Sequence, residues 1–163
     1  MKVLSVDPGY DRLGLAVIEK NKKETLLYSE CYQTRNDLPF PERLGLIGNR
    51  VRELISSYQP DAIAVEDLFF SKNTKTALKV SESRGVVIFQ AIDADIPVYE
   101  YTPNQIKVAV TGYGKASKID VYTMVSRLID LGKGKKLDDE IDAIAIGLTF
   151  FALYKNTEHE LGV

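Results

Sequence analysis

Two apolar runs, far apart in the sequence and each ended by an acidic residue, constrain the fold most. Residues 3–6 precede Asp7, and residues 62–65 precede Glu66. A predicted helix lies between the runs, so a right-handed crossover would lay them side by side as parallel strands. Their carboxyl ends would then share one sheet edge, where open α/β sheets usually bind ligands. We therefore expect Asp7 and Glu66 to meet at that edge.

The rest of the pattern predicts an α/β fold with a five-stranded mixed sheet flanked by helices. Three strands joined by short turns come first, and strands that alternate with helices follow. Alternation and flanking turn residues place the strands at 2–7, 13–19, 24–33, 62–66 and 97–101. Helical spacing places helices from just after Pro41 to Tyr58 and over about 74–93, 103–110, 117–130 and 138–154.

The predicted helix over 74–93 has an apolar side. Leu78, Val86, Phe89 and Ile92 recur on it, and we expect them in the core. Gly85 lies among them, where the lack of a side chain permits close packing.

Length and composition indicate one domain. A chain of 163 residues, 45% of them hydrophobic, can bury a core of its own. We expect a single domain over 1–154 and a polar C-terminal tail over 155–163. Its longest apolar stretches are shorter than the roughly 20 residues that cross a bilayer. The single cysteine, Cys31, cannot form an internal disulfide, so we expect a cytoplasmic protein in which Cys31 is a packed thiol rather than a nucleophile.

Charge is unevenly distributed, although the net value is only −2. Residues 72–84 carry four basic side chains against one acid, and residues 104–118 carry three lysines and no acid. Each run alone is usually a solvated face. Two such runs beside a cluster of acids favour a nucleic-acid partner, because association depends on local potential.

A second pair of acids stands near the start of the last predicted helix. Asp139 and Asp142 are three positions apart, so both can face the same side of it. Together with Asp7 and Glu66 they would form a cluster that repels itself unless it protonates or binds cations. Hard divalent ions such as Mg²⁺ and Mn²⁺ prefer carboxylate oxygen and water. The cluster therefore suggests metal-dependent phosphodiester hydrolysis.

Each acid also has a structural explanation when it is taken alone. Asp7 could cap the turn that it starts, and Glu66 could pair with a lysine. Acids at the start of the last helix could complement its positive end. We treat Asp138 and Glu140 as caps or outer groups of the site. The combination, in an order that converges on one edge, favours the functional interpretation.

In these residues the chain resembles the RuvC family of Holliday-junction resolvases. The matching residues are Val6-Asp7-Pro8-Gly9, Gly14, Ala64-Val65-Glu66, Phe69, Lys72, Asn73, Ala77-Leu78-Lys79, Arg84-Gly85, Gln105-Ile106-Lys107, Gly112-Tyr113-Gly114-Lys115-Ala116, Lys118, Asp139 and Asp142-Ala143. Ser83 stands where the family more often has alanine. The resemblance covers about residues 2–152. It implies an RNase H-like fold, a homodimer, and Mg²⁺-dependent symmetrical nicking of four-way DNA junctions that leaves 5′-phosphate ends, in recombination and DNA repair.

The resemblance also implies a role for each site residue. Asp7, Glu66, Asp139 and Asp142 would hold two Mg²⁺ ions, about 4 Å apart, with Asp7 between them. Mn²⁺ can substitute for Mg²⁺. Lys107 and Lys118 match positions near the scissile phosphate, where a fixed cation stabilises developing charge.

The expected DNA contacts lie outside this cluster. Phe69 would stack on a base at the junction centre, a contact typically worth roughly 1–3 kcal/mol. Lys72, Lys75 and Lys79 would follow phosphates, and the expected DNA-binding set also contains Arg84 and Lys115. The helix over 74–93 is the candidate dimer contact, because a two-fold dimer suits symmetrical cutting of two strands.

Alternative functions stay open at this point. The chain could be an RNase H-like nuclease that acts on another branched or hybrid substrate, or a non-catalytic junction-binding protein. An actin-like or sugar-kinase ATPase also begins with a strand followed by Asp and Gly, but it normally needs two such domains and this chain is too short. Whether branch-migration helicase proteins assist the chain is also open.

Overall fold

The computed structural model describes residues 1–68 and 74–154, with only the backbone at 74–75. Its elements are β1 (Lys2–Asp7), β2 (Arg12–Lys20), β3 (Glu24–Gln33), α1 (Phe40–Tyr58), β4 (Ala62–Glu66), α2 (Thr74–Asp93), β5 (Val98–Tyr101), α3 (Pro103–Thr111), α4 (Lys118–Leu128) and α5 (Asp138–Leu153). They agree with the predicted bounds to within one or two residues. The expected tail over 155–163 lies outside the described residues.

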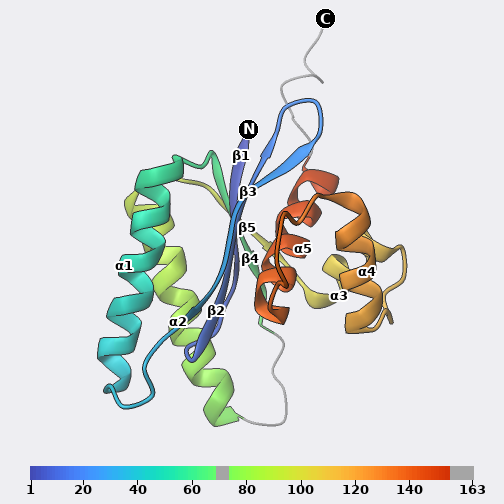
Figure 1. The fold of residues 1–163 in the computed structure, drawn as a ribbon. Helices are drawn as coiled ribbons and strands as arrows, with labels where there is room; N and C mark the ends of the chain where they lie inside the picture. Colours follow the sequence, from blue (N-terminus) through green and yellow to red (C-terminus); the bar gives the residue numbers. More distant parts are fainter. Residues whose placement is uncertain (69–73, 155–163) are drawn as a thin grey trace, which may run out of the picture.

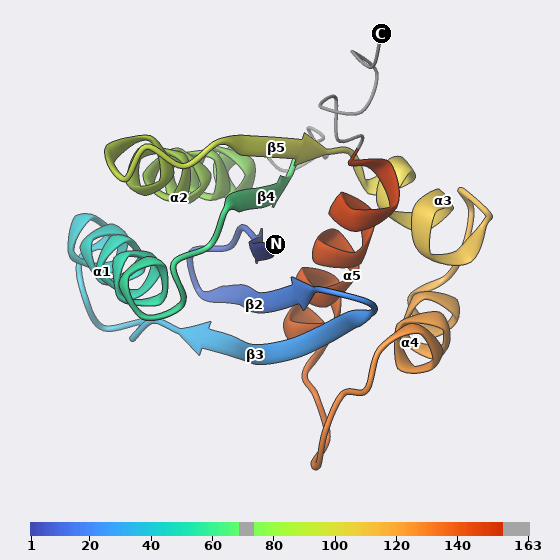
Figure 2. The ribbon, with the colours of Figure 1, turned by 90° about the horizontal axis from the view of Figure 1, so that it is seen from above.

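One mixed sheet forms the middle layer, with strand order β3-β2-β1-β4-β5. The first three strands pair antiparallel, and β1–β4 and β4–β5 pair parallel. Figure 1 shows α1 and α2 on one face of the sheet and α3, α4 and α5 on the other, and the turned view of Figure 2 shows the same layers. The predicted α/β class with a five-stranded mixed sheet is therefore confirmed.

The central strands are mostly apolar because both faces of the sheet are covered, and the one polar residue inside β1, Ser5, donates a hydrogen bond to the backbone oxygen of Ala16. Alternate residues of β1 enter separate cores: Val3 packs under α5, whereas Leu4 and Val6 pack under α1 and α2. The acidic residues of β1 and β4, Asp7 and Glu66, lie at the ends of these strands, where burial is less complete.

Short local motifs place the helices that lead to the sheet edge. Pro41 lies in the first turn of α1, where a missing backbone N–H costs nothing. Thr102 caps α3 and Ser117 caps α4, each through a reciprocal capping box that satisfies two helix-end donors. None of the described helices is both long and apolar enough to cross a membrane.

The prediction for the buried side of α2 was largely wrong. Leu78, Phe89 and Ile92 are 60%, 60% and 61% exposed, and only Val86 of the four expected core residues packs against the core. The sheet is instead contacted by a neighbouring stripe that includes Val87 and Ala91. The helix carries two apolar stripes, and spacing alone does not say which of them faces the sheet.

Glycine packing between α1 and α2 also differs from the prediction. A Cβ at Gly85 would meet nothing within 4 Å, so Gly85 serves no close contact inside the fold. The close approach falls on Gly48 of α1, where a Cβ would lie 3.1 Å from the Val86 side chain.

Candidate active site

Asp7 and Glu66 meet at the edge of the sheet where β1 and β4 end. The two strands run parallel with Val6 opposite Val65, so the next residue of each strand carries a carboxyl group at the same height. Burial, followed by the charges of Glu66, Asp142 and Asp139, raises the pKa of Asp7 well above its usual range. Burial and the charge of Asp142 raise the pKa of Glu66 to about 7.

The first turn of α5 brings two more acids to the same edge. Asp7, Glu66, Asp139 and Asp142 line one pocket of about 370 Å³, together with Lys107 and Lys118 and with the apolar wall Pro103, Ile106, Val121 and Ile146. The helix can approach because Gly14 of β2 has no side chain. A Cβ there would lie 2.1 Å from the backbone oxygen of Asp139. Burial raises the pKa of Asp142 as well, against the opposing effect of Lys118.

Glu140 turns away from this pocket. Its carboxylate accepts hydrogen bonds from the backbone N–H of Leu137 at 3.0 Å and from the Ser29 hydroxyl at 2.8 Å, and it pairs with Lys136 at 3.3 Å. It therefore caps α5, in line with the role expected for it. Asp138 does not line the pocket either.

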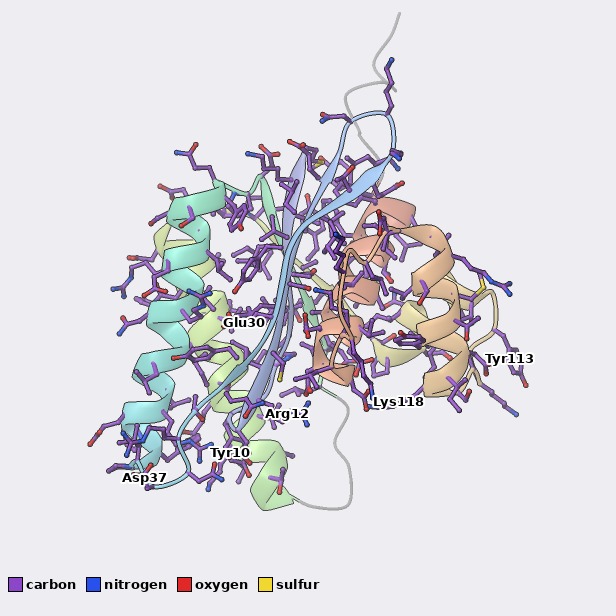
Figure 3. The ribbon with its side chains drawn as sticks, in the orientation of Figure 1. Tyr10, Arg12, Glu30, Asp37, Tyr113 and Lys118 are labelled. Carbon is purple, nitrogen blue, oxygen red and sulfur yellow. The ribbon has the colours of Figure 1, made fainter. Side chains whose placement is uncertain are left out.

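Two lysines bring positive charge to the pocket. Lys118 is the first residue of α4, and its Nζ lies 3.5 Å from Oδ2 of Asp142 although 76% of its side chain is exposed. The charge of Asp142 is the main cause of the raised pKa of Lys118. Lys107 reaches the pocket from α3, and its charge acts on Glu66. Figure 3 shows Lys118 in the helix layer, at the same end of the molecule as Arg12.

The four acids have different partners. Asp139 forms an ion pair with Arg12 and accepts a hydrogen bond from the Cys31 thiol, and Asp142 pairs with Lys118. Within residues 1–68 and 74–154, no three acidic, histidine or cysteine side chains already form a ready ligand set for one ion. The donors nevertheless fit a hard divalent cation, because they are carboxylate oxygens whose mutual repulsion a cation would relieve.

Arg84 braces the end of β4. Its guanidinium donates to the backbone oxygen of Glu66 at 3.3 Å, lies 3.5 Å from Asp67 and binds Glu100 of β5. Only 16% of the side chain is exposed. These contacts make Arg84 a support for Glu66.

The other residues expected to bind DNA lie in different surroundings. The ammonium group of Lys79 lies over the rings of Tyr10 and Phe40, 5.1 and 5.2 Å from their centroids. Lys115 is exposed on the loop between α3 and α4 and has no ion-pair partner in the part of the chain that the structure describes. Phe69 and Lys72, and the side chain of Lys75, lie outside the described residues.

Three supporting residues were missed in the sequence. Arg43 of α1 is only 7% exposed and holds the loop after β1, through the Tyr10 backbone oxygen at 3.0 Å, the Thr34 hydroxyl at 2.8 Å and the Asp11 carboxylate. Ser83 of α2 donates to the backbone oxygen of Gly9 at 2.9 Å, and Arg12 binds Asp139. A charged residue on the apolar stripe that contains Ile47 and Val51 was the available signal for Arg43.

Comparisons with known proteins agree on one group. The family model described as Crossover junction endodeoxyribonuclease RuvC matches residues 3–150. The crossover junction endodeoxyribonuclease RuvC of Desulforamulus reducens is 44% identical over 150 residues, which are 91% of each chain.

Solved structures extend the likeness to the fold. T. thermophilus RuvC in complex with a Holliday junction substrate is 38% identical, with a TM-score of 0.87 over 93% of each chain. The yeast mitochondrial Holliday junction resolvase Ydc2 is 15% identical, with a TM-score of 0.66 over 92% of this chain and 78% of the other. At that identity the second likeness concerns the fold alone, which is the RNase H-like fold.

Proposed function

Because the chain belongs to the RuvC family of crossover junction endodeoxyribonucleases, we propose that it resolves Holliday junctions by hydrolysing DNA phosphodiester bonds at the pocket between β1, β4 and α5. The observation that carries this site is the meeting of four carboxyl groups and two lysines, from five separate elements, in one pocket. We infer that these elements act as a single nuclease domain over residues 1–154.

The acids of the pocket are the proposed ligands of divalent ions. Asp7, Glu66, Asp139 and Asp142 would hold two Mg²⁺ ions, for which Mn²⁺ can substitute. The raised pKa values of Asp7, Glu66 and Asp142 support this role. Crowded carboxyl groups keep their protons in the absence of metal, and a bound cation would displace those protons into solvent. Bound divalent ions would supply Lewis-acid polarisation of the phosphate and activation of a water molecule.

The lysines of the pocket act on the substrate. Lys118 is largely exposed beside Asp142, so its ammonium group can reach a phosphate oxygen while its first carbons stay fixed by the capped α4. Lys107 lies on the wall next to Glu66. We assign both to stabilising the charge that develops on the phosphate during attack. Attack by water with departure of the 3′ oxygen would leave a 5′-phosphate on the product.

The exposed stripe of α2 is the proposed dimer contact. Leu78, Phe89 and Ile92 are each about three-fifths exposed, and Gly85 lies among them with open space at its Cβ position. Their spacing of seven, four and three residues forms one line along the helix, as in helices that pair. Two copies joined there would present two pockets to one junction, as symmetrical nicking requires.

We propose DNA contacts around the pocket, and one of them is the exposed Lys115, which precedes the pocket residue Lys118 by three positions. We also propose Phe69, Lys72 and Lys75 for the loop and helix start that follow Glu66. Resolution of junctions serves recombination and DNA repair, and a cytoplasmic location and a link to branch-migration helicase proteins fit that role.

The direct test is incubation of the purified protein with a synthetic four-way junction, with Mg²⁺ and with EDTA. We expect paired nicks at symmetric positions with Mg²⁺, none with EDTA, and none with Asp7→Asn although that variant still binds the junction. Equal cutting of plain duplex or RNA–DNA hybrid would favour a different nuclease activity. Binding without cutting by the native chain would favour a junction-binding protein.

A further inference from the structure

Two side chains, those of Arg12 and Cys31, converge on a single oxygen of Asp139. Arg12, the first residue of β2, forms an ion pair with Oδ2 of Asp139 through its Nη2. The Nε of Arg12 donates to the Cys31 sulfur at 3.4 Å, and the Cys31 thiol donates to the same Oδ2 at 3.6 Å. All contacts that the described residues make with this carboxylate therefore fall on Oδ2, and Oδ1 stays available.

The backbone fixes this arrangement. Gly14 lies two residues after Arg12, hence on the same face of β2, and the backbone oxygen of Asp139 occupies the space of its missing side chain. The start of β2 and the start of α5 are thus in direct contact. Figure 3 shows Arg12 at one end of the sheet. The packing of β2 against α5 therefore brings Arg12 and Asp139 together, so the ion pair does not depend only on the length of the arginine side chain.

The ion pair between Arg12 and Asp139 is weak enough to be replaced by another cation. The guanidinium of Arg12 is always charged, but 47% of its side chain is exposed, and half-exposed ion pairs are weak. A divalent ion carries twice the charge and would compete for the same carboxylate. A deeply buried ion pair, in contrast, would be difficult for a divalent ion to displace from Asp139.

We propose that Arg12 is a positioning residue that serves as the internal counter-ion of Asp139 and is displaced from it when a divalent ion enters the pocket. The inference rests on the proposed metal site. Arg12 holds Asp139 in place and balances its charge before metal binds, and in return it lowers the affinity of the site for the metal. Lys118 would do the same for Asp142 but also acts on the phosphate, whereas Arg12 does not line the pocket.

A double-mutant cycle of Arg12→Gln and Asp139→Asn tests the exchange, with unfolding in urea measured in EDTA and in excess Mg²⁺. In EDTA we expect the two side chains to be coupled by about 2- to 5-fold in the unfolding equilibrium constant, the range of exposed ion pairs. In Mg²⁺ the coupling should disappear. By the same linkage, Arg12→Gln should bind Mg²⁺ about 2- to 5-fold more tightly in calorimetry, and Arg12→Lys should stay close to the native protein.

Arg35→Gln is the control, because Arg35 forms an ion pair with Asp37 that lies away from the pocket and is more exposed than the pair of Arg12 with Asp139. Its effect should be the same in EDTA and in Mg²⁺. Coupling of Arg12 and Asp139 that persists in Mg²⁺, or no coupling in EDTA, would overturn the proposal. Failure of the native protein to bind Mg²⁺ would refute the metal site itself, and that result is read from the native titration alone.

Discussion

Removing divalent ions should make the protein less stable as pH rises, and Glu66 should account for much of the loss. The pKa of Glu66 is raised from 4.5 to about 7 in the folded protein. A carboxyl group with a raised folded pKa binds its proton more tightly when folded, so its contribution is complete below pH 4.5 and is lost as pH rises through 7. The difference corresponds to about 3 kcal/mol of unfolding free energy.

The assay is urea unfolding between pH 5 and 8 in EDTA, for the native protein and for Glu66→Gln. The native protein should lose about 3 kcal/mol more than the variant over this range, since the substitution also relieves the repulsion on Asp7. Mg²⁺ should suppress the loss in the native protein only. Glu42→Gln, an exposed acid of α1 on the other face of the sheet, serves as the control. Parallel pH profiles for the native protein and Glu66→Gln in EDTA would refute the reasoning.

Four further outcomes follow from the contacts described above. Lys118→Gln should lower the rate of junction cleavage by about 10²- to 10³-fold while binding in a gel-shift assay stays close to native, because a fixed charge at the phosphate is lost; unchanged cleavage would contradict that role. Gly14→Ala should destabilise the fold by about 1–3 kcal/mol in thermal unfolding and weaken Mg²⁺ binding, because the new Cβ collides with the backbone of Asp139. Ser83→Ala should cost about 1 kcal/mol of stability through one lost hydrogen bond to the loop after β1, and an unchanged melting temperature would argue against it. Phe89→Lys should convert a dimer into a folded monomer in light scattering, since the side chain is exposed in the single chain; a dimer that persists would move the interface elsewhere.

The two acid-ended strands could be predicted because their sequences leave little choice. A strand covered on both faces is mostly apolar and carries no charge in its interior, so a carboxylate at its end is conspicuous and marks the sheet edge. Asp139 and Asp142 could be placed with them because three positions on a helix share a side. Local rules of periodicity and burial were sufficient for these four residues.

The supporting contacts depend on information that is not local. α2 carries two apolar stripes, and only the fold shows that Val87, rather than Phe89, faces the sheet. The pairing of Arg12 with Asp139 joins residues far apart in sequence, through a close approach at Gly14 that could be read only as a family match. Arg84 was expected only among the DNA contacts, and its contact with the backbone oxygen of Glu66 was not predicted.

The hydrogen bond from Ser83 to Gly9 has a consequence for how two cuts could be timed. It joins the helix proposed to meet a second copy to the loop that begins at Asp7, two residues before Gly9. If a second copy packed poorly against α2, the displacement of α2 would therefore be transmitted through this hydrogen bond to Asp7 in the active site. A protein with alanine at position 83 would lack this hydrogen bond, so the two copies of its dimer would have to coordinate their cuts through other contacts.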